Sequence, residues 1–320
     1  MAQVVCFGDL LIDFVPTVTG TGLADAPAFV KAPGGAAANV AVGLARLGVT
    51  SAFMGKVGDD PFGRFLAATL AAEGVDIAPL RFEPRARTAL AFVSLRADGE
   101  RQFLFYRHPS ADMLFTPDEV DTGAIRAARV FHFDSISLAA DQPRATALHA
   151  TALARAQGKL VSYDVNLRLP LWPDPATAQT GIRHGLQQAN IVKLSDDELH
   201  FLTGSREPKA VQQLWHEGLQ LVTLSMGSAG SVWFTATESG HVATFPVQAV
   251  DTTGAGDGFM AGLLAGILAA PDALADPPRL QRVCRFANAV GALATTERGA
   301  IPALPTRAAA ENFLAGMEPS

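Results

Sequence analysis

The sequence predicts an α/β fold with a mainly parallel central sheet and helices on both of its faces. Short apolar segments alternate with helical segments along most of the 320 residues, a pattern that is typical of such a sheet. The strand segments are apolar, as expected for strands that are covered on both faces. One hairpin, at 88–107, breaks the alternation and indicates a small separate sheet.

The N-terminal part of the chain predicts two strands and two helices in alternation. Residues 3–15 (QVVCFGDLLIDFV) form an apolar run that ends in acidic residues and is predicted as one buried strand. Residues 33–48 hold a glycine-rich turn and then an alanine-rich helix that ends at Gly48. A second strand is predicted at 50–58, and a second helix at 60–74.

The middle of the chain continues the alternation, and the part from Thr253 onward is mostly helical. Strands are predicted at 128–136, 159–166, 189–195 and 219–226. Helices between them include 144–156 and 174–188. Ligands bind such sheets where the carboxyl ends of the strands meet the loops. Polar residues at predicted strand ends are Asp13, Asp164, Asn166 and Ser195.

A small β-sheet lid over this cleft is predicted from two segments, about 14–32 and 88–107. The second segment reads as two strands joined by Ala97-Asp98-Gly99-Glu100, and Asp-Gly is the strongest short-range hairpin signal. The first segment also lacks helical periodicity. An exposed lid edge favours pairing with a second subunit, so we expect a homodimer.

Composition excludes several classes of protein. The net charge of −6 and the absence of a Lys/Arg cluster argue against a nucleic-acid surface. No apolar run approaches the roughly 20 residues that span a bilayer, and the N-terminal stretch lacks a basic region. Cys6 and Cys284 are read as small core residues. We expect a cytoplasmic protein with no nucleic-acid or membrane partner.

The length of the chain suits two domains or one large α/β domain with an appendage.

The stretch AVDTTGAGDGFMAGLLAGILAA, residues 249–270, predicts an anion site. A glycine-rich loop that enters a long helix presents unpaired backbone N–H groups at the positive end of the helix dipole. Phosphate is the usual occupant, and glycine lets the backbone approach it closely. Asp257 falls in the first helical turn, where a carboxylate can take the proton from a hydroxyl that attacks phosphorus.

The same stretch has a simpler explanation, because Asp is common near helix N-termini and Gly in turns. The Walker A pattern and the dinucleotide fingerprint GxGxxG are both missing here. By those signatures the chain is neither a P-loop kinase nor a nicotinamide enzyme.

Several motifs, in order, carry a resemblance that covers nearly the whole chain. They are PGGAAANVAVGLARLG, GKVGDDPFG, YDVNLRLPLW, KLSDDEL, SMGSAGS, DTTGAGDGF and FANAVGALATTERGAIPALP. The chain resembles the ribokinase-like (PfkB) carbohydrate kinases, and among them it is most similar to fructokinases. The resemblance implies one domain, 1–320, with a three-layer α/β/α sandwich and a β-sheet lid. It also implies that the protein phosphorylates a sugar hydroxyl with ATP. The similarity to fructokinases implies fructose as the sugar and fructose 6-phosphate as the product.

The resemblance assigns the catalytic residues. Asp257 matches the general base of the family, in agreement with the loop chemistry above. The backbone amides of Gly254, Ala255 and Gly256 match its anion hole. Arg168, in DVNLR, matches a contact to the incoming phosphate or to the substrate, and a guanidinium suits phosphate oxygens.

Sugar-binding residues are implied near the N-terminus and in the lid. Asp13 matches the sugar-binding aspartate of the family, and Gly34, Gly35 and Asn39 match its GG…N contact. A carboxylate accepts from two neighbouring hydroxyls, while Asn both donates and accepts. The alternative for Asp13 is an exposed turn. Arg107, at the end of the second lid strand, is a candidate substrate contact or a solvated lid charge.

Nucleotide and cation ligands are also implied by the resemblance. The residues matched to the ATP site are Lys193, Ser195, Ser225, Gly227, Gly230, Gly254, Gly256 and Asn288. Glu198 matches the residue that organises Mg²⁺ through water, with helix capping as its alternative. This chain has Ser195 where the wider family has Asn. Asp251 and the carbonyl of Thr253 match a monovalent-cation site, usually potassium. Otherwise Asp251 fixes its loop by accepting backbone N–H groups.

Alternative functions of two classes stay open from the sequence. Within the family they are a 2-keto-3-deoxygluconate kinase and a ribokinase-type kinase, and an acid substrate would call for a cation such as Arg107 or Arg168. From another class, the chain could be a non-catalytic sugar- or nucleotide-binding protein. Such a protein would be expected to have lost Asp257 or the GAG loop, and both are present.

Overall fold

The computed structural model describes residues 1–18, 20–95 and 101–317. It confirms the predicted α/β fold, with a parallel central sheet and a separate small sheet. The central sheet has nine strands in the order β13-β12-β11-β10-β9-β8-β1-β4-β5. All neighbours from β5 to β11 pair in parallel, whereas β12 and β13 are antiparallel. These strands are β1 (Val4–Phe7), β4 (Ser51–Gly58), β5 (Leu80–Glu83), β8 (Val130–Asp134), β9 (Leu160–Asp164), β10 (Ile191–Ser195), β11 (Leu221–Ser225), β12 (Ser231–Phe234) and β13 (Ser239–Val242).

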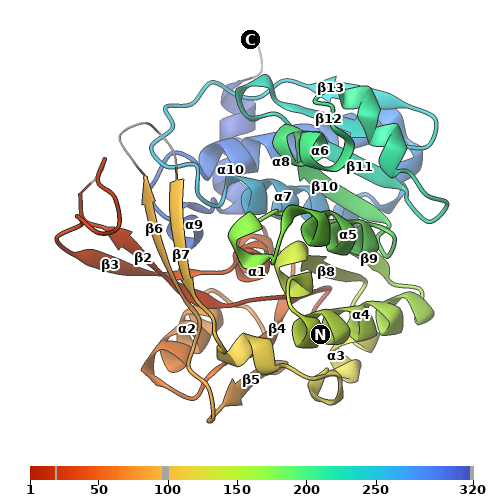
Figure 1. Cartoon of the computed structure of the whole chain (residues 1–320). Helices are drawn as coiled ribbons and strands as arrows, with labels where there is room; N and C mark the ends of the chain where they lie inside the picture. The colour runs from red at the N-terminus through yellow and green to blue at the C-terminus, as the bar shows by residue number, and fades with distance from the viewer. Residues whose placement is uncertain (19, 96–100, 318–320) are drawn as a thin grey trace.

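Helices cover both faces of this sheet, which gives three layers (Figure 1). One hydrophobic cluster joins the sheet to α1, α2, α7 and α8, and the other joins it to α3–α6. The helices are α1 (Ala36–Arg46), α2 (Pro61–Ala72), α3 (Thr122–Ala127), α4 (Asp141–Ala156), α5 (Pro175–Leu186), α6 (Asp196–Thr203), α7 (Ala255–Ala269), α8 (Pro277–Leu293), α9 (Ala300–Ala303) and α10 (Arg307–Gly316). None of the helices that the structure describes is long and apolar enough to cross a membrane.

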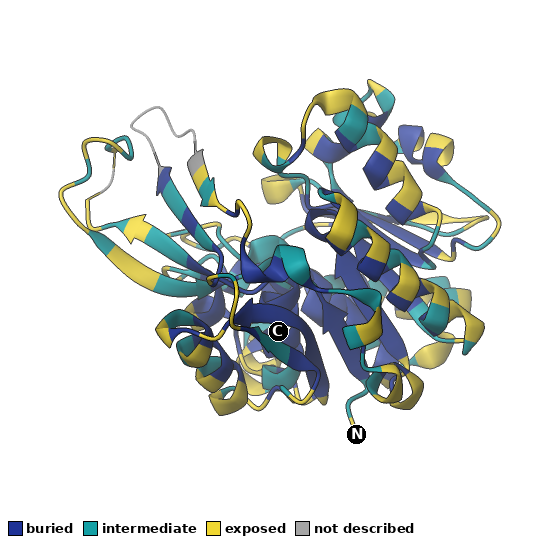
Figure 2. Ribbon diagram, turned by 60° about the horizontal axis from the view of Figure 1, so that its bottom comes forward, coloured by how far each residue is buried: buried dark blue, intermediate teal, exposed yellow. Residues whose placement is uncertain are grey.

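The lid is a separate four-stranded sheet in the order β3-β2-β6-β7. Its strands are β2 (Leu11–Pro16), β3 (Phe29–Gly34), β6 (Leu90–Leu95) and β7 (Arg101–Tyr106). The predicted hairpin partners β6 and β7 do pair antiparallel, and their turn, Ala97 to Glu100, lies outside the described residues. Figure 2 shows the lid standing off the body, with exposed residues on its outer strands and buried ones in the central sheet.

The N-terminal run 3–15 is two strands and not the single strand predicted. β1 ends at Phe7 in the central sheet, and β2 begins at Leu11 in the lid. The chain turns between them at Gly8, where a Cβ would lie only 2.7 Å from Cβ of Ala37. Because an apolar run does not reveal which sheet a strand joins, the sequence alone could not show this break.

Aromatic rings connect the lid to the body. Phe14 on β2 stacks on Phe92 of β6, with ring centroids 5.0 Å apart. Phe14 also meets Phe62 of α2 edge-on, at 6.0 Å. Edge-on and offset contacts of this kind are favourable for aromatic pairs. The lid is therefore fixed at its base by packing against α2.

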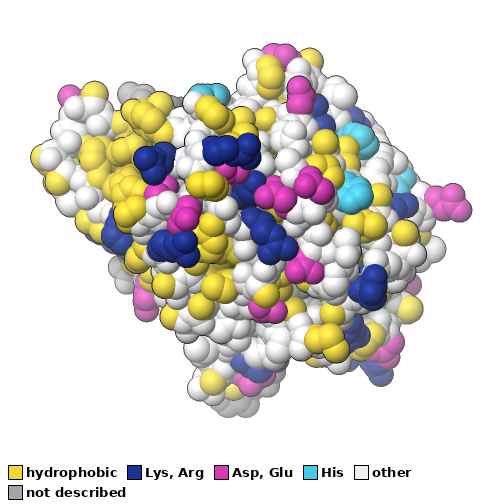
Figure 3. All heavy atoms as spheres, turned by 90° about the horizontal axis from the view of Figure 1, so that it is seen from below, with side chains coloured by type: hydrophobic (Ala, Val, Ile, Leu, Met, Phe, Trp, Pro, Cys, Tyr) yellow, Lys and Arg dark blue, Asp and Glu magenta, His cyan; other side chains and the backbone are white. Residues whose placement is uncertain are grey.

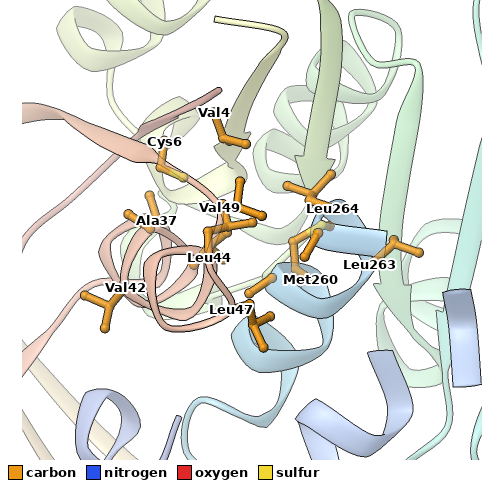
Figure 4. Packing of buried hydrophobic residues seen from close by; sticks show 14 of the residues in the cluster. Val4, Cys6, Ala37, Val42, Leu44, Leu47, Val49, Met260, Leu263 and Leu264 are labelled. Atoms are coloured by element: carbon orange, nitrogen blue, oxygen red, sulfur yellow. The ribbon is translucent and has the colours of Figure 1, made fainter. Parts of the chain in front are cut away.

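Helices α1 and α7 pack closely against each other, and their contact positions the site. Figure 4 shows Leu44 of α1, and Leu47 directly after this helix, facing Met260 and Leu264 of α7. A Cβ at Gly43 would lie 2.7 Å from Cβ of Ala261, so only glycine permits this approach. Close packing of this kind is sensitive to a single added methyl group. The N-terminal turns of both helices are consequently held together.

Candidate active site

The strand order reverses at β1, which lies between β4 and β8. In parallel sheets a crevice for ligands forms at such a switch point, outside the carboxyl ends of the strands. Asp9 follows β1, Asp134 ends β8, and Asp164 ends β9. All three side chains are buried. This end of the sheet thus collects carboxylates in the place where the fold can bind a ligand.

The N-terminal end of α7 brings Asp257 to this crevice. Gly254 caps the helix with φ of 81°, a left-handed conformation that favours glycine. A Cβ there would also lie 2.9 Å from Cα of Ala300. Gly254, Ala255 and Gly256 thus form the entry to the helix, where backbone amides lack intrahelical acceptors. The predicted anion-binding segment has the helix-terminal geometry that such a site requires.

Asp257 makes one side-chain hydrogen bond, to Asn39 of α1. Nδ2 of Asn39 donates to Oδ2 of Asp257 at 2.8 Å. Burial raises the pKa of Asp257, while the bond from Asn39 and the charge of Lys193 lower it in part. A carboxyl with a raised pKa is a stronger base than an ordinary aspartate. Oδ1 of Asn39 is buried and has no hydrogen-bond partner among the described residues.

Lys193 lies against the same helix end. Its Nζ is 3.0 and 3.1 Å from the two carboxylate oxygens of Asp164. A Cβ at Gly256 would lie 2.8 Å from this Nζ, so the ammonium group is next to the predicted anion hole. Burial alone would lower the pKa of Lys193, but Asp164 and Glu198 raise it above its ordinary value. Lys193 is therefore a fixed positive charge at the site.

Asp13 lies on lid strand β2 beside the glycines of the predicted sugar contact. A Cβ at Gly34 would come within 2.1 Å of its carboxylate, so Gly34 leaves the space that Asp13 occupies. Gly35 has φ of 113° and packs on the carbonyl oxygen of Asp9. Burial raises the pKa of Asp13 to about 7, with a further rise from Asp9 and a partial opposing effect of Arg168.

Arg107 is buried and ion-paired, so the alternative of a solvated lid charge is wrong. Its guanidinium pairs with Asp112, and the two side chains are 8% and 6% exposed. Asp112 lies in η1 (Ala111–Leu114), which follows the lid. Burial alone would lower the pKa of Arg107, but Asp112 and Asp9 raise it. The sequence did not single out Asp112.

Arg168 lies beyond the end of β9, after Asn166, which has a positive φ of 36°. Its Nη1 donates to the carbonyl oxygen of Leu167 at 3.0 Å. The charge of Arg168 lowers the pKa of both Asp13 and Asp257. Arg168 therefore acts electrostatically on the two carboxylates that the sequence assigned to sugar binding and catalysis.

Ser195 and Glu198 form a capping box at the start of α6. Helix capping was the alternative to a magnesium contact that the sequence left open for Glu198. Oε2 of Glu198 accepts the backbone N–H of Ser195 at 2.7 Å. Oε1 accepts that of Leu167 at 2.8 Å, which ties α6 to the loop before Arg168. Each oxygen keeps a second lone pair, so a water ligand at Glu198 is compatible with this arrangement.

The predicted nucleotide loop follows β11. Ser225 ends the strand, Gly227 begins η6 (Gly227–Ala229) with φ of 54°, and Gly230 follows it with φ of 89°. A Cβ at Gly227 would meet no atom within 4 Å, whereas one at Gly230 would clash with the carbonyl of Val242. Asn288 of α8 is buried and donates from Nδ2 to the carbonyl oxygens of Val242 and Ala243. Asn288 thus ties α8 to the end of β13, against which Gly230 of the loop packs.

Asp251 organises the loop before α7. Its Oδ1 accepts from the backbone N–H of Thr253 at 2.9 Å and from the hydroxyl of Thr253 at 2.7 Å. Its Oδ2 accepts from the N–H of Gly299 at 3.0 Å. The structure therefore shows the loop-fixing contacts that were the alternative to a cation site, and it places the carboxylate next to Thr253.

Two buried groups at the site had no assigned role in the sequence. Asp134 caps η3 (Ser135–Leu138), and burial and the charges of Asp9 and Asp164 raise its pKa well above the ordinary range. Burial raises the pKa of Asp9 to about 6. For Asp134 the available signal was an acidic residue near the end of a predicted strand, whereas Asp9 fell inside the predicted strand 3–15. His132 is also buried, and its Nδ1 lies 3.1 Å from Oγ of Ser162.

Comparison with known proteins identifies the family. Residues 1–307 match the profile described as pfkB family carbohydrate kinase. The chain belongs to the PfkB family of carbohydrate kinases. This confirms the resemblance seen in the sequence motifs.

Among the residues that the structure describes, no group of three or more His, Cys, Asp or Glu residues could hold a metal ion.

Fructokinases are prominent among the PfkB proteins that resemble this chain. A protein named probable fructokinase-3 from Arabidopsis thaliana is 52% identical, over 97% of this chain and 91% of its own length. A fructokinase from Xylella fastidiosa with bound ATP has a TM-score of 0.90 and 37% identity, covering 99% of both chains. A fructokinase from Vibrio cholerae O395, bound to fructose, ADP and calcium, has a TM-score of 0.87 and 37% identity, over 98% of this chain and 99% of its own.

Proposed function

We propose that the chain is an ATP-dependent fructokinase, which transfers the γ-phosphoryl group of ATP to the 6-hydroxyl of fructose. The observation that carries the proposal is the meeting of Asn39 and Asp257 at the N-terminal end of α7. This contact supports the proposal because a buried carboxylate that can act as a base and a hydrogen-bonding amide meet beside a helix end of the kind that binds phosphate. The similarity to fructokinases over nearly the whole chain supports the choice of sugar.

In this proposal Asp257 takes the proton from the attacking hydroxyl as its oxygen bonds to phosphorus. The amides of Gly254, Ala255 and Gly256 donate to the oxygens of the transferring group, and ADP leaves. Phosphoryl transfer asks little covalent chemistry of the protein, so positioning and charge compensation supply most of the catalysis. Arg168 adds a positive charge on the side of the two carboxylates.

The sugar is held under the lid by residues of two elements. Asp13 of β2 accepts from its hydroxyls, and Asn39 of α1 donates to or accepts from them. The backbones of Gly34 and Gly35 pass close to Asp13 and Asp9 and have no side chains to fill the pocket. Lid closure over the sugar excludes water and so suppresses ATP hydrolysis.

The residues near α7 fit a nucleotide. Only glycine at position 256 leaves Lys193 in its place beside the helix end, where the charge of its ammonium group attracts phosphate oxygens. Ser225, Gly227 and Gly230 border the phosphates or ribose, and Asn288 lies near the adenine. Mg²⁺ bound to ATP offsets phosphate charge, and Glu198 contacts it through water.

A monovalent cation, potassium in this proposal, binds beside Asp251 and the carbonyl of Thr253. The support is chemical, since hard cations take oxygen ligands from carboxylates and carbonyls. The hydrogen bonds of Asp251 already order the loop that leads to Gly254. A bound cation would therefore add to an existing link between this loop and the anion hole.

The proposal includes a homodimer formed through the lids. Figure 3 shows hydrophobic side chains gathered on the left, where the lid lies. Large exposed apolar side chains in and around the lid strands are Val15, Val18, Val30, Leu104 and Tyr106. Apolar patches of this kind commonly mark interfaces. A cytoplasmic location is also proposed, where ATP is available and the buried, unpaired Cys6 and Cys284 stay reduced.

The experiment that tests the proposed activity is an ATP-consumption assay with fructose, 2-keto-3-deoxygluconate, ribose and adenosine side by side. We expect the highest kcat/KM with fructose. Asp257→Asn serves as the inactive control and should lower kcat at least about 100-fold without loss of folding. Turnover of another compound while fructose is ignored would overturn the proposed substrate. Binding of fructose and nucleotide without any turnover would favour the non-catalytic class.

A further inference from the structure

The buried ion pair between Arg107 and Asp112 bears on which substrates the site accepts. Arg107 follows β7, and Asp112 lies on η1, so the pair connects the lid to the body. The hydroxyl of Ser110 donates to the second carboxylate oxygen of Asp112. Asp112 is therefore held on both of its oxygens, and the charge of Arg107 is compensated inside the protein.

The pair shares a small cavity with Asp9, whose carbonyl oxygen lies against Gly35 of the proposed sugar contact. Arg107, Asp112 and Asp9 line one small cavity of about 10 Å³, together with Ser137. The charge of Arg107 lowers the pKa of Asp9, and the charge of Asp9 raises that of Asp13. Charges interact strongly in a buried setting of low dielectric constant. Arg107 thus acts on Asp9, and Asp9 in turn acts on the proposed sugar ligand Asp13.

Carboxyl groups outnumber guanidinium groups around this part of the site, and burial raises the pKa of Asp9, Asp13 and Asp134. The carboxyl groups there are Asp9, Asp13, Asp112 and Asp134, and the guanidinium groups are Arg107 and Arg168. Lys56 also lines the small cavity, but it pairs with Glu83 at 3.0 Å and Glu119 at 2.7 Å. A substrate carboxylate would add another negative charge here. Arg107 is a cation that could offset that charge, but its own charge is already compensated by Asp112.

We propose that Asp112 makes the site select neutral sugars over sugar acids, because it neutralises Arg107. The inference rests on the proposed function and narrows its substrate class. Asp112 acts through Arg107 and is a positioning residue, since its two oxygens are held by Arg107 and Ser110. Removal of its charge leaves the charge of Arg107 available to a substrate carboxylate.

The test compares fructose with 2-keto-3-deoxygluconate in the Asp112→Asn variant, which keeps the shape and one acceptor oxygen. We expect the ratio of kcat/KM for the acid to that for fructose to rise at least about tenfold, mainly through a lower KM for the acid. Asp112→Glu, which keeps the charge, should preserve the wild-type ratio. The double variant Arg107→Gln with Asp112→Asn should lose the gain. Glu73→Gln breaks the separate Arg46–Glu73 pair and should leave the ratio unchanged.

An unchanged ratio in folded Asp112→Asn would overturn the inference, and so would an equal loss of kcat/KM for both substrates. Loss of one partner of a buried pair is destabilising, so Asp112→Ser is measured as a second variant. Failure of both to fold would assign the pair to stability alone. If the wild type phosphorylates neither compound, the proposed function fails. The ratio of the two binding affinities, measured by thermal shift with each compound, then replaces the ratio of kcat/KM values. The two failures are therefore distinguishable.

Discussion

Nδ2 of Asn39 lies 2.8 Å from Oδ2 of Asp257, and this bond joins residues 218 positions apart in the chain. It connects the first turn of α1 to the first turn of α7. The two helices can meet there because Gly43 and Ala261 let them approach closely further along. The candidate base is thus oriented by a neighbour that the proposal also assigns to sugar binding.

Replacement of Asn39 by Ala should lower kcat/KM for fructose by about tenfold or more. The bond from Asn39 stabilises the charged form of Asp257 and lowers its pKa, and hydrogen bonds to charged groups are worth about 1.5–3 kcal/mol. Without the bond the pKa of Asp257 rises. When the pH is lowered, the variant therefore loses activity at a higher pH than the wild type does. The measurement is the pH profile of kcat/KM. A profile whose acid limb stays in place would contradict the assignment of Asp257 as the titrating base.

Replacement of Gly256 by Ala should reduce kcat by about 10- to 100-fold and lower the thermal unfolding midpoint, because it strains a buried ion pair. The new Cβ would lie 2.8 Å from Nζ of Lys193, and the flexible lysine side chain would move away. That movement takes its charge from the predicted phosphate position and strains the pair with Asp164. Steady-state kinetics with ATP and a thermal unfolding midpoint are the measurements. Gly316→Ala, where a Cβ meets no atom within 4 Å, is the control and should behave as wild type.

Replacement of Asp13 by Asn should stabilise the fold at pH 8 more than at pH 4.5. Burial, with Asp9, raises the pKa of Asp13 to about 7 from an ordinary value of 3.8. Between these values the folded protein binds the proton and the unfolded chain does not, so stability from this group is lost as pH rises toward 7. Each unit of pKa difference corresponds to about 1.4 kcal/mol.

The same Asp13→Asn variant should bind fructose more weakly, because a charged acceptor is lost. Unfolding midpoints at the two pH values test the electrostatic part, and titration with fructose tests the binding part. An equal midpoint change at both pH values would mean that Asp13 carries no raised pKa in the folded state.

Replacement of Val30 by Asp should convert the proposed dimer into a monomer. Val30 pairs with Val15 across β2 and β3, and the two residues are 59% and 43% exposed. A charge placed in an apolar interface is strongly unfavourable. Light scattering at micromolar concentration is the measurement, with Met317→Asp on the exposed end of α10 as the control. A wild-type protein that is already monomeric would remove the dimer from the proposal.

Local patterns were sufficient for much of the site. The loop before α7 carries its own chemistry, since glycines at 254 and 256 and a carboxylate at 257 predict a helix-terminal phosphate site without knowledge of the fold. The alternation of apolar strands and helices predicted the parallel sheet, and the structure confirms it. Both signals depend on residues close together in the chain.

Other features depend on the path of the chain in space and could not be predicted. The break between β1 and β2 follows from Gly8 turning against Ala37, a contact with a helix nearly thirty positions on. The pairing of Arg107 with Asp112 requires the turn after β7 to fold back. Glu198 has the spacing of a capping box and of a magnesium contact alike, and only its bonds to two backbone amides show the first.

Strand β2 both belongs to the lid and carries Asp13. Any opening of the lid therefore withdraws one of the proposed hexose contacts, while Asn39 and Asp257 remain with the body. Fructose affinity and enclosure are consequently one linked equilibrium. A substitution of Phe62 on α2, which packs against Phe14 of the lid, can alter the KM for the sugar although Phe62 is not a proposed sugar contact.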